Sequence, residues 1–143
     1  MSELDKLKPK KFKASTSMSE LMMELQDGIT TSMFRVGTPD DPEAPTVFQT
    51  YFPPGYEVPP HTHACDYAEI ILEGSQQVTR KWHKAGDVRI VKAGTVYGPL
   101  VAGPEGAKVL LIFSNARFSP IPVGDKDSAS FERYGVERLQ PAT

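Results

Sequence analysis

The chain has 143 residues, which is the usual length of one domain and enough to bury a core without disulfides or metals as staples. Apolar residues make up 39% of it and charged residues 24%, and the formal net charge of -2 argues against nucleic acid or an anionic membrane as a partner. The single cysteine, Cys65, cannot form an internal disulfide. No apolar run approaches the roughly 18 residues of a membrane span, and the polar, Lys-rich start does not resemble a signal peptide, so we expect a cytoplasmic protein.

The first 28 residues are expected to form a tail and a short helix. Residues 1–16 are rich in lysine and poor in apolar residues, which predicts a flexible basic tail ahead of one domain spanning residues 17–143. Ser17 and Glu20 form a capping-box pattern before an apolar, Met-rich run that Gly28 ends. This pattern predicts a short helix whose apolar face packs as a plug against the rest of the domain.

From residue 29 onward, short β-rich or alternating runs are separated by turn residues. We expect strands over residues 29–36, 46–52, 67–72, 88–92 and 108–113, a hairpin over 76–84, and a further strand that begins at 97–100. Turns are predicted at 73–74 and 103–106, and a terminal helix or strand at 131–139. Strands at intervals of roughly 8 to 12 residues with no helices between them predict an all-β sandwich or barrel.

The strongest chemical signal is a pair of histidines one residue apart, His61 and His63. On an extended backbone both imidazoles lie on one face of the strand, because side chains alternate with period 2. Such a pair suits zinc, iron, nickel or manganese and needs one or two further ligands. The alternative is an ordinary solvated strand face. Candidates for the further ligands are Cys65, Asp66, Tyr67 and Glu69.

This stretch resembles the first cupin motif, in which Gly, five residues, His-x-His, three or four residues, Glu, six residues and Gly follow one another. Four residues fall on that spacing: Gly55, His61, His63 and Gly74. Tyr67 stands at the position of the motif Glu, and Glu69, two residues further on, points the same way on an extended strand. The resemblance implies a divalent transition metal, Fe, Zn, Mn or Ni, held by His61, His63 and Glu69.

The second cupin motif is present in outline. Its turn glycines are Gly86 and Gly94, but Tyr97 stands at the position of the family's third metal histidine and Val101 at that of its Asn. The resemblance covers roughly residues 45–114 and implies a cupin jelly-roll β-barrel with a short N-terminal helix. It also implies a homodimer, to which residues 29–36 are expected to contribute.

A cupin barrel would gather the candidate site at its mouth, with walls from Phe48, Ile71 and Phe113. The residues expected there are His61, His63, Tyr67, Glu69 and Tyr97. Of these we expect Glu69, Tyr97 and Tyr67 to act in catalysis, and the sequence leaves open whether Glu69 is a metal ligand or a base. Cys65 is expected to be a small buried thiol, and His83 a surface residue away from the site.

Three functions are compatible with these residues. The first is a metal-dependent cupin enzyme acting on a compact oxygenated small molecule, such as a diketone, hydroxy-ketone, sugar acid or polyketide-like compound, as a dioxygenase, isomerase, lyase or cyclase. The second is a metal-free acid-base cupin like the sugar epimerases, in which His61 or His63 works with Tyr97. The third is a cupin that binds a small ligand without turning it over. The fold does not choose among them.

Overall fold

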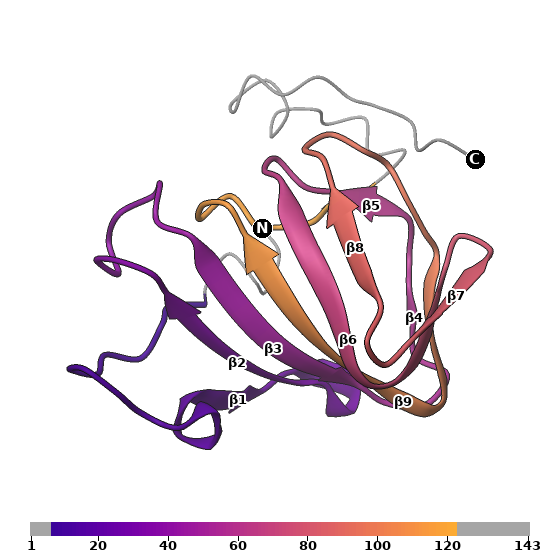
Figure 1. Cartoon of the computed structure of the whole chain (residues 1–143), viewed down its shortest axis with the longest axis horizontal. Helices are drawn as coiled ribbons and strands as arrows, with labels where there is room; N and C mark the ends of the chain where they lie inside the picture. Colours follow the sequence, from indigo (N-terminus) through magenta and orange to yellow (C-terminus); the bar gives the residue numbers. More distant parts are fainter. Residues whose placement is uncertain (1–6, 123–143) are drawn as a thin grey trace.

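The computed structural model describes residues 7–122, and nearly all of its regular elements are β-strands (Figure 1). The elements in chain order are the 3-10 helix η2 (Met18–Leu21), β1 (Met22–Glu24), the 3-10 helix η3 (Gln26–Gly28), β2 (Thr30–Arg35), β3 (Thr46–Phe52), β4 (Glu57–Val58), β5 (His61–Thr62), β6 (Tyr67–Val78), β7 (Lys81–Lys84), β8 (Val88–Val91), β9 (Leu100–Phe113) and β10 (Ile121–Pro122). The all-β expectation is confirmed. The terminal element expected over residues 131–139 lies outside the described residues, within which no helix is long and apolar enough to cross a membrane.

One curved antiparallel sheet dominates the architecture, with β6 and β9 at its centre (Figure 1). Its strand order is β1-β2-β3-β9-β6-β7, while β4 also pairs with β9 and β8 with β6. The short strands β5 and β10 pair with each other and bring the segment that contains His61 against the open side of the sheet. The inner face of the sheet therefore looks onto the histidine segment, and the candidate site lies between them.

The expected N-terminal helix is wrong apart from its first turn. The Ser17 side chain accepts a hydrogen bond from the Glu20 backbone N–H at 3.4 Å, as the capping pattern predicts, but η2 lasts only four residues. The chain then becomes β1, whose Met22 lies opposite Ser32 of β2. The free edge of β2 offers backbone hydrogen bonds that a helix here would forgo. Leu21 is nevertheless buried and Met23 packs on the core, so the segment still covers the barrel.

Two predicted turns are also wrong, because the chain bends there without ending a strand. Both β6 and β9 run on through them, and the pairing of β6 with β9 shifts register on either side of Glu73 and Gly74. Gly74 has φ of 75°, and a Cβ at this position would lie 2.1 Å from the Gly106 carbonyl oxygen. The bulges also change which residues face inward, so that Glu69 and Gln76 both line the inner face although one is odd and the other even in sequence.

The core lies on the inner face of the sheet and is rich in aromatic rings. Phe48 makes edge-to-face contacts with Phe113 and Phe118, with ring centroids 5.8 and 4.8 Å apart. Ile71, which was expected among the cavity walls, belongs instead to a separate apolar cluster with Ala102, Ala107 and Val109. The aromatic cluster thus forms the rigid wall behind the candidate site.

Candidate functional site

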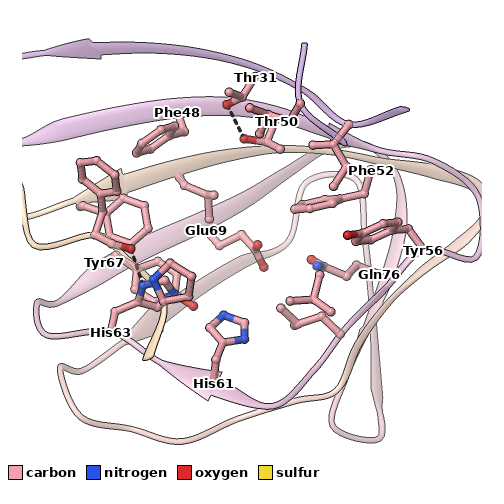
Figure 2. Close-up of a pocket in the computed structure, with 18 of the residues that line it drawn as sticks. Thr31, Phe48, Thr50, Phe52, Tyr56, His61, His63, Tyr67, Glu69 and Gln76 are labelled. Carbon is pink, nitrogen blue, oxygen red and sulfur yellow. Dashed lines mark hydrogen bonds between the residues drawn. The ribbon is translucent and has the colours of Figure 1, made fainter. Parts of the chain in front are cut away.

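A cavity of about 320 Å³ opens between the sheet and the histidine segment (Figure 2). Its lining is mainly apolar and aromatic, from residues that include Leu25, Ile29, Phe48, Phe52, Tyr56, Val58, Leu100, Leu111, Phe113 and Phe118. All five residues that the sequence placed at the barrel mouth line it: His61, His63, Tyr67, Glu69 and Tyr97. Thr31, Thr50 and Gln76 add polar groups. An apolar cavity with a few convergent polar groups is the usual form of a small-molecule site.

The two imidazoles have the same tautomer, which their backbone partners determine. His61 Nδ1 lies 2.8 Å from the Pro59 carbonyl oxygen, and His63 Nδ1 lies 2.7 Å from that of Phe118. A carbonyl oxygen only accepts hydrogen bonds, so each Nδ1 carries the proton and each Nε2 is an acceptor. His61 is also fixed by two backbone hydrogen bonds with Tyr97, of 3.0 and 3.1 Å. Both rings are therefore rigid and present a lone pair at Nε2.

Burial keeps both imidazoles uncharged. The pKa of His63 is lowered to about 3, mainly by loss of hydration and to a smaller extent by the neighbouring His61, against the opposing effect of its hydrogen bond to Phe118. Burial likewise lowers the pKa of His61, against the opposing effect of its hydrogen bond to Pro59, and the charge of Arg89 adds to the lowering. Near neutral pH the site therefore contains two neutral bases and no imidazolium.

The two cavity tyrosines connect to His61 in a buried chain of hydrogen bonds. The Tyr67 hydroxyl donates to the Tyr97 oxygen, and the Tyr97 hydroxyl donates to His61 Nε2 over 3.0 Å. Burial raises the pKa of both phenols well above the ordinary value, so both stay protonated. The chain Tyr67, Tyr97, His61 is thus an ordered set of neutral donors and acceptors at the cavity wall.

Glu69 is bound by an arginine that the sequence reasoning missed. Arg89 donates from Nε and Nη2 to the same oxygen, Glu69 Oε1, over 3.1 and 2.9 Å. Burial alone would lower the pKa of Arg89, but the Glu69 carboxylate outweighs it and the pKa is raised. The guanidinium carbon also lies 5.1 Å from the centre of the Tyr97 ring. The carboxylate is therefore charge-compensated within the site, and Oε2 is the oxygen that Arg89 leaves free.

Arg89 was missed because its strand buries the charged residue and exposes the apolar ones. The alternating run Val88-Arg-Ile-Val91 predicts a half-buried strand but does not say which face is buried. In the structure Val88 and Ile90 point outward, with 57% and 78% of their surface exposed, and Arg89 points inward. The register opposite Glu69 makes this possible, since a buried carboxylate supplies the charge partner that a buried arginine needs.

The three predicted metal ligands line one cavity but are not arranged as a metal site in this structure. The described part of the chain holds no group of three or more His, Cys, Asp or Glu side chains placed to bind a metal ion. Arg89 donates hydrogen bonds to Glu69, and the Tyr97 hydroxyl donates one to His61 Nε2. Two other candidate ligands lie outside the cavity lining, where Cys65 is a buried free thiol, as expected, and Asp66 accepts the Ala93 backbone N–H at 2.7 Å.

Gln76 is the second functional candidate that sequence reasoning missed. It lines the cavity with only 1% of its surface exposed, although a simple alternation from Glu69 would direct residue 76 outward. The bulges around Gly74 turn it inward. The sequence carried no signal for this beyond the glycine itself. His83, opposite Gln76 in β7, is half-buried and does not line the cavity, in agreement with its expected position away from the site.

No protein-family model and no curated protein matches this sequence. Several solved structures share its architecture. The polyketide cyclase RemF from Streptomyces resistomycificus aligns with a TM-score of 0.64 and 16% identity, over 85% of this chain and 93% of its own. An RmlC-like cupin from Shewanella frigidimarina aligns with a TM-score of 0.59 and 23% identity, over 73% and 94%. Oxalate decarboxylase from Bacillus subtilis aligns with a TM-score of 0.61 and 18% identity, over 90% of this chain but 42% of its own. The chain therefore has the cupin fold, an all-β jelly-roll barrel.

Proposed function

We propose that this chain is a small cupin enzyme that carries out acid-base chemistry on a compact oxygenated molecule with a carbonyl next to a hydroxyl-bearing carbon, such as a hydroxy-ketone or a sugar acid. One observation carries the proposal: a buried chain of neutral hydrogen-bonding groups, Tyr67 to Tyr97 to His61, lies beside the compensated carboxylate of Glu69 in one cavity. Structural cores rarely gather so many titratable groups around an open space, whereas active sites commonly do.

The roles follow from which groups hold protons. Glu69 Oε2, the oxygen not engaged by Arg89, accepts the proton from the hydroxyl-bearing carbon next to the substrate carbonyl and returns it to the former carbonyl carbon, while the proton of the substrate hydroxyl passes to the former carbonyl oxygen. The Tyr97 hydroxyl turns from His61 Nε2 to the substrate oxygen and stabilises the enolate that forms. Tyr67 holds Tyr97 in place through its own hydrogen bond. No proton is gained or lost overall, so the reaction is an isomerisation of a hydroxy-carbonyl compound.

A metal-dependent reaction is the second candidate, and the histidine tautomers favour it. Metal-binding imidazoles commonly donate their other N–H to a backbone carbonyl, as His61 and His63 both do. A divalent ion held by the two Nε2 atoms would polarise a substrate carbonyl. This reading requires Arg89 to release Glu69 and the Tyr97 hydroxyl to leave His61, so the acid-base reading needs fewer changes to the arrangement.

Deuterium exchange tests the proposal without knowledge of the natural substrate. Purified protein of measured metal content is incubated in D₂O with a panel of hydroxy-ketones, diketones and sugar acids, and exchange at the carbon next to the carbonyl is followed by NMR. We expect exchange with hydroxyl-bearing members of the panel, its loss in the Glu69→Gln and Tyr97→Phe variants, and its persistence after chelation.

The other outcomes separate the remaining functions. Exchange that stops on chelation and returns with one added ion would support the metal-dependent candidate over the acid-base one. Absence of exchange across the panel, with and without added Fe(II), Zn, Mn or Ni, would contradict both enzyme readings and leave a ligand-binding cupin. The His83→Gln variant is the matched control, since His83 does not line the cavity.

A further inference from the structure

Gln76 holds a polar atom in the cavity that nothing in the protein satisfies. Its side chain is almost fully buried, and Oε1 has no hydrogen-bond partner. A buried acceptor without a donor costs free energy, and most such groups in native structures are paired. Two other buried side-chain atoms of the described residues share this condition, but they belong to Arg35 and Thr62, which do not line the cavity. The unpaired acceptor of Gln76 therefore needs an explanation of its own.

Several hydrogen-bond donors in and beside the cavity are already engaged. The hydroxyls of Thr31 and Thr50 bind each other at 2.8 Å, and the N–H groups of the two imidazoles are bound to backbone carbonyls. Arg89 directs its bonds to Oε1 of Glu69. Three acceptors of the lining residues receive no hydrogen bond from the described part of the chain: Gln76 Oε1 and Glu69 Oε2 on β6 and Nε2 of His63. Such a surface suits a ligand that brings donors of its own.

Figure 2 shows Glu69 and Gln76 both extending from β6 into the cavity, with Phe52 and Tyr56 beside Gln76. These two rings are stacked, with centroids 5.9 Å apart and planes 24° from parallel. The wall next to the unpaired acceptor is therefore mainly aromatic. A flat or apolar part of a ligand would pack on these rings while a hydroxyl or N–H at its edge reaches Gln76.

We propose that Gln76 is a specificity-determining residue that accepts a hydrogen bond from a hydroxyl or N–H group of the substrate. The inference deepens the proposed function, because it assigns the group that recognises the substrate's hydroxyl in the same cavity. It is tested by binding and by stability, neither of which requires turnover. A chain with no exchange activity can still pass this test, so the two failures are distinguishable.

The binding experiment uses three probes that differ in one group: 2-naphthol, 2-methoxynaphthalene and 2-naphthoate. Titration by calorimetry or by ligand-observed NMR compares the parent with Gln76→Met, which keeps the length of the side chain and removes its oxygen. We expect 2-naphthol to bind the parent best, and Gln76→Met to weaken it roughly tenfold while leaving 2-methoxynaphthalene almost unchanged. The charged 2-naphthoate, which brings acceptors only, should bind the parent weakest.

Stability gives a second, ligand-free readout. Without ligand, Gln76→Met removes an unpaired buried acceptor, so we expect its thermal midpoint to rise by about 3 °C. Gln77→Met is the matched control, because Gln77 is the neighbouring residue on β6 and does not line the cavity. It should change neither the binding of the probes nor the midpoint.

Three results would overturn the proposal. One is that the parent does not bind 2-naphthol. Another is that Gln76→Met weakens both neutral probes equally, which would mean that the side chain only shapes the wall or donates from its amide nitrogen. The third is that the Gln76→Met midpoint falls although its binding of the probes is unchanged, which would assign Gln76 a structural role.

Discussion

Burial, more than any charged neighbour, decides the protonation of the cavity histidines. The pKa of His63 falls to about 3 mainly because its ring is removed from water, and its hydrogen bond to Phe118 opposes this only in part. In the unfolded chain the same ring titrates near pH 6.5. The unfolded state therefore binds more protons than the native state between these two values.

This difference predicts how stability depends on pH. Because the native pKa of His63 is depressed, the free energy of unfolding falls as the pH decreases through the unfolded value of about 6.5 and keeps falling toward the native value. We expect a loss of about 2 kcal/mol from this residue between pH 7 and pH 5, measured by urea unfolding. His61 shifts in the same direction and adds to the slope.

Variants assign that slope to the cavity. The free energy of unfolding of the His63→Gln variant should depend less steeply on pH than that of the parent over the same range. For His83→Gln, on the partly exposed strand β7, the dependence should be almost as steep as for the parent. A parent whose stability is flat between pH 7 and pH 5 would mean that the cavity histidines are protonated as easily as in the unfolded chain.

The hydrogen bonds among the tyrosines make a prediction about coupling. Tyr97→Phe leaves the Tyr67 hydroxyl without its acceptor, so we expect a loss of about 1 to 3 kcal/mol in the free energy of unfolding. Tyr67→Phe combined with Tyr97→Phe should cost less than the sum of the two single changes, because both partners are then gone. Urea unfolding of the four proteins measures the coupling. Additive losses would show that the two hydroxyls do not interact.

At the scale of the elements, sequence patterns located strands well and bends poorly. The strand expected over residues 46–52 is β3 itself, since prolines 45 and 53 delimit a run rich in β-formers. The glycines at 74 and 106 carry the same signal whether a chain turns back or bends within a strand. Only the partner strand distinguishes the two, and pairing between β6 and β9 is not readable from either segment alone.

Gly74 is expected to be far less replaceable than a glycine of the same backbone conformation elsewhere. Gly74 and Gly55 have φ of 75° and 73°, but a Cβ at Gly74 would collide with the Gly106 carbonyl oxygen, while Gly55 has nothing within 4 Å. Gly55→Ala should cost about 1 to 2 kcal/mol for its left-handed backbone alone. Gly74→Ala should cost at least about 3 kcal/mol, because the strands must also move apart. Equal losses of unfolding free energy for the two variants, measured by urea unfolding, would contradict the close approach of β6 and β9 at Gly74.

On the scale of the whole molecule, the outward-facing apolar side chains of β8 create an apolar outer face. Ile90 and Ile112 flank Ala68 in the register of the sheet, and both are exposed, as are Val88 and Leu72. Exposed apolar patches of this kind commonly mark contacts with other chains. The homodimer implied by the resemblance to cupins stays a prediction, and this face is a candidate for its interface.

Light scattering after size exclusion tests the interface. We expect the parent to elute as a dimer and Ile90→Glu to elute as a monomer, since a buried carboxylate without a partner is costly. Trp82→Glu is the control, because Trp82 is an exposed apolar residue on β7 and pairs with the far part of β6. A monomeric parent, or a dimer that Ile90→Glu leaves intact, would rule out this face.

The sequence predicted which residues line the cavity but not which residues they bind there. The motif spacing predicted that the two histidines, Tyr67, Glu69 and Tyr97 line one cavity, and they do. The alternation of side chains along a strand and the resemblance to the cupin barrel were enough for this prediction. The sequence could not reveal Arg89 or Gln76, whose directions depend on the register of β8 and on the bulges of β6. Arg89, which binds Glu69, is what favours the proposed acid-base chemistry over the predicted metal triad.

The protonation of the cavity histidines is the most direct test of the acid-base site. A long-range ¹H–¹⁵N NMR spectrum of the imidazoles, recorded from pH 7.5 to pH 5 on protein of measured metal content, reports the tautomer and charge of each ring. We expect His63 to remain neutral throughout this range and His61, whose pKa is also lowered by burial, to stay neutral near neutral pH, each with the proton on Nδ1 and with Nε2 unprotonated. A proton on Nε2 of His61 near neutral pH would contradict the hydrogen-bonded chain from Tyr67 to His61, and an imidazolium at His63 above pH 5 would contradict the neutral, buried site.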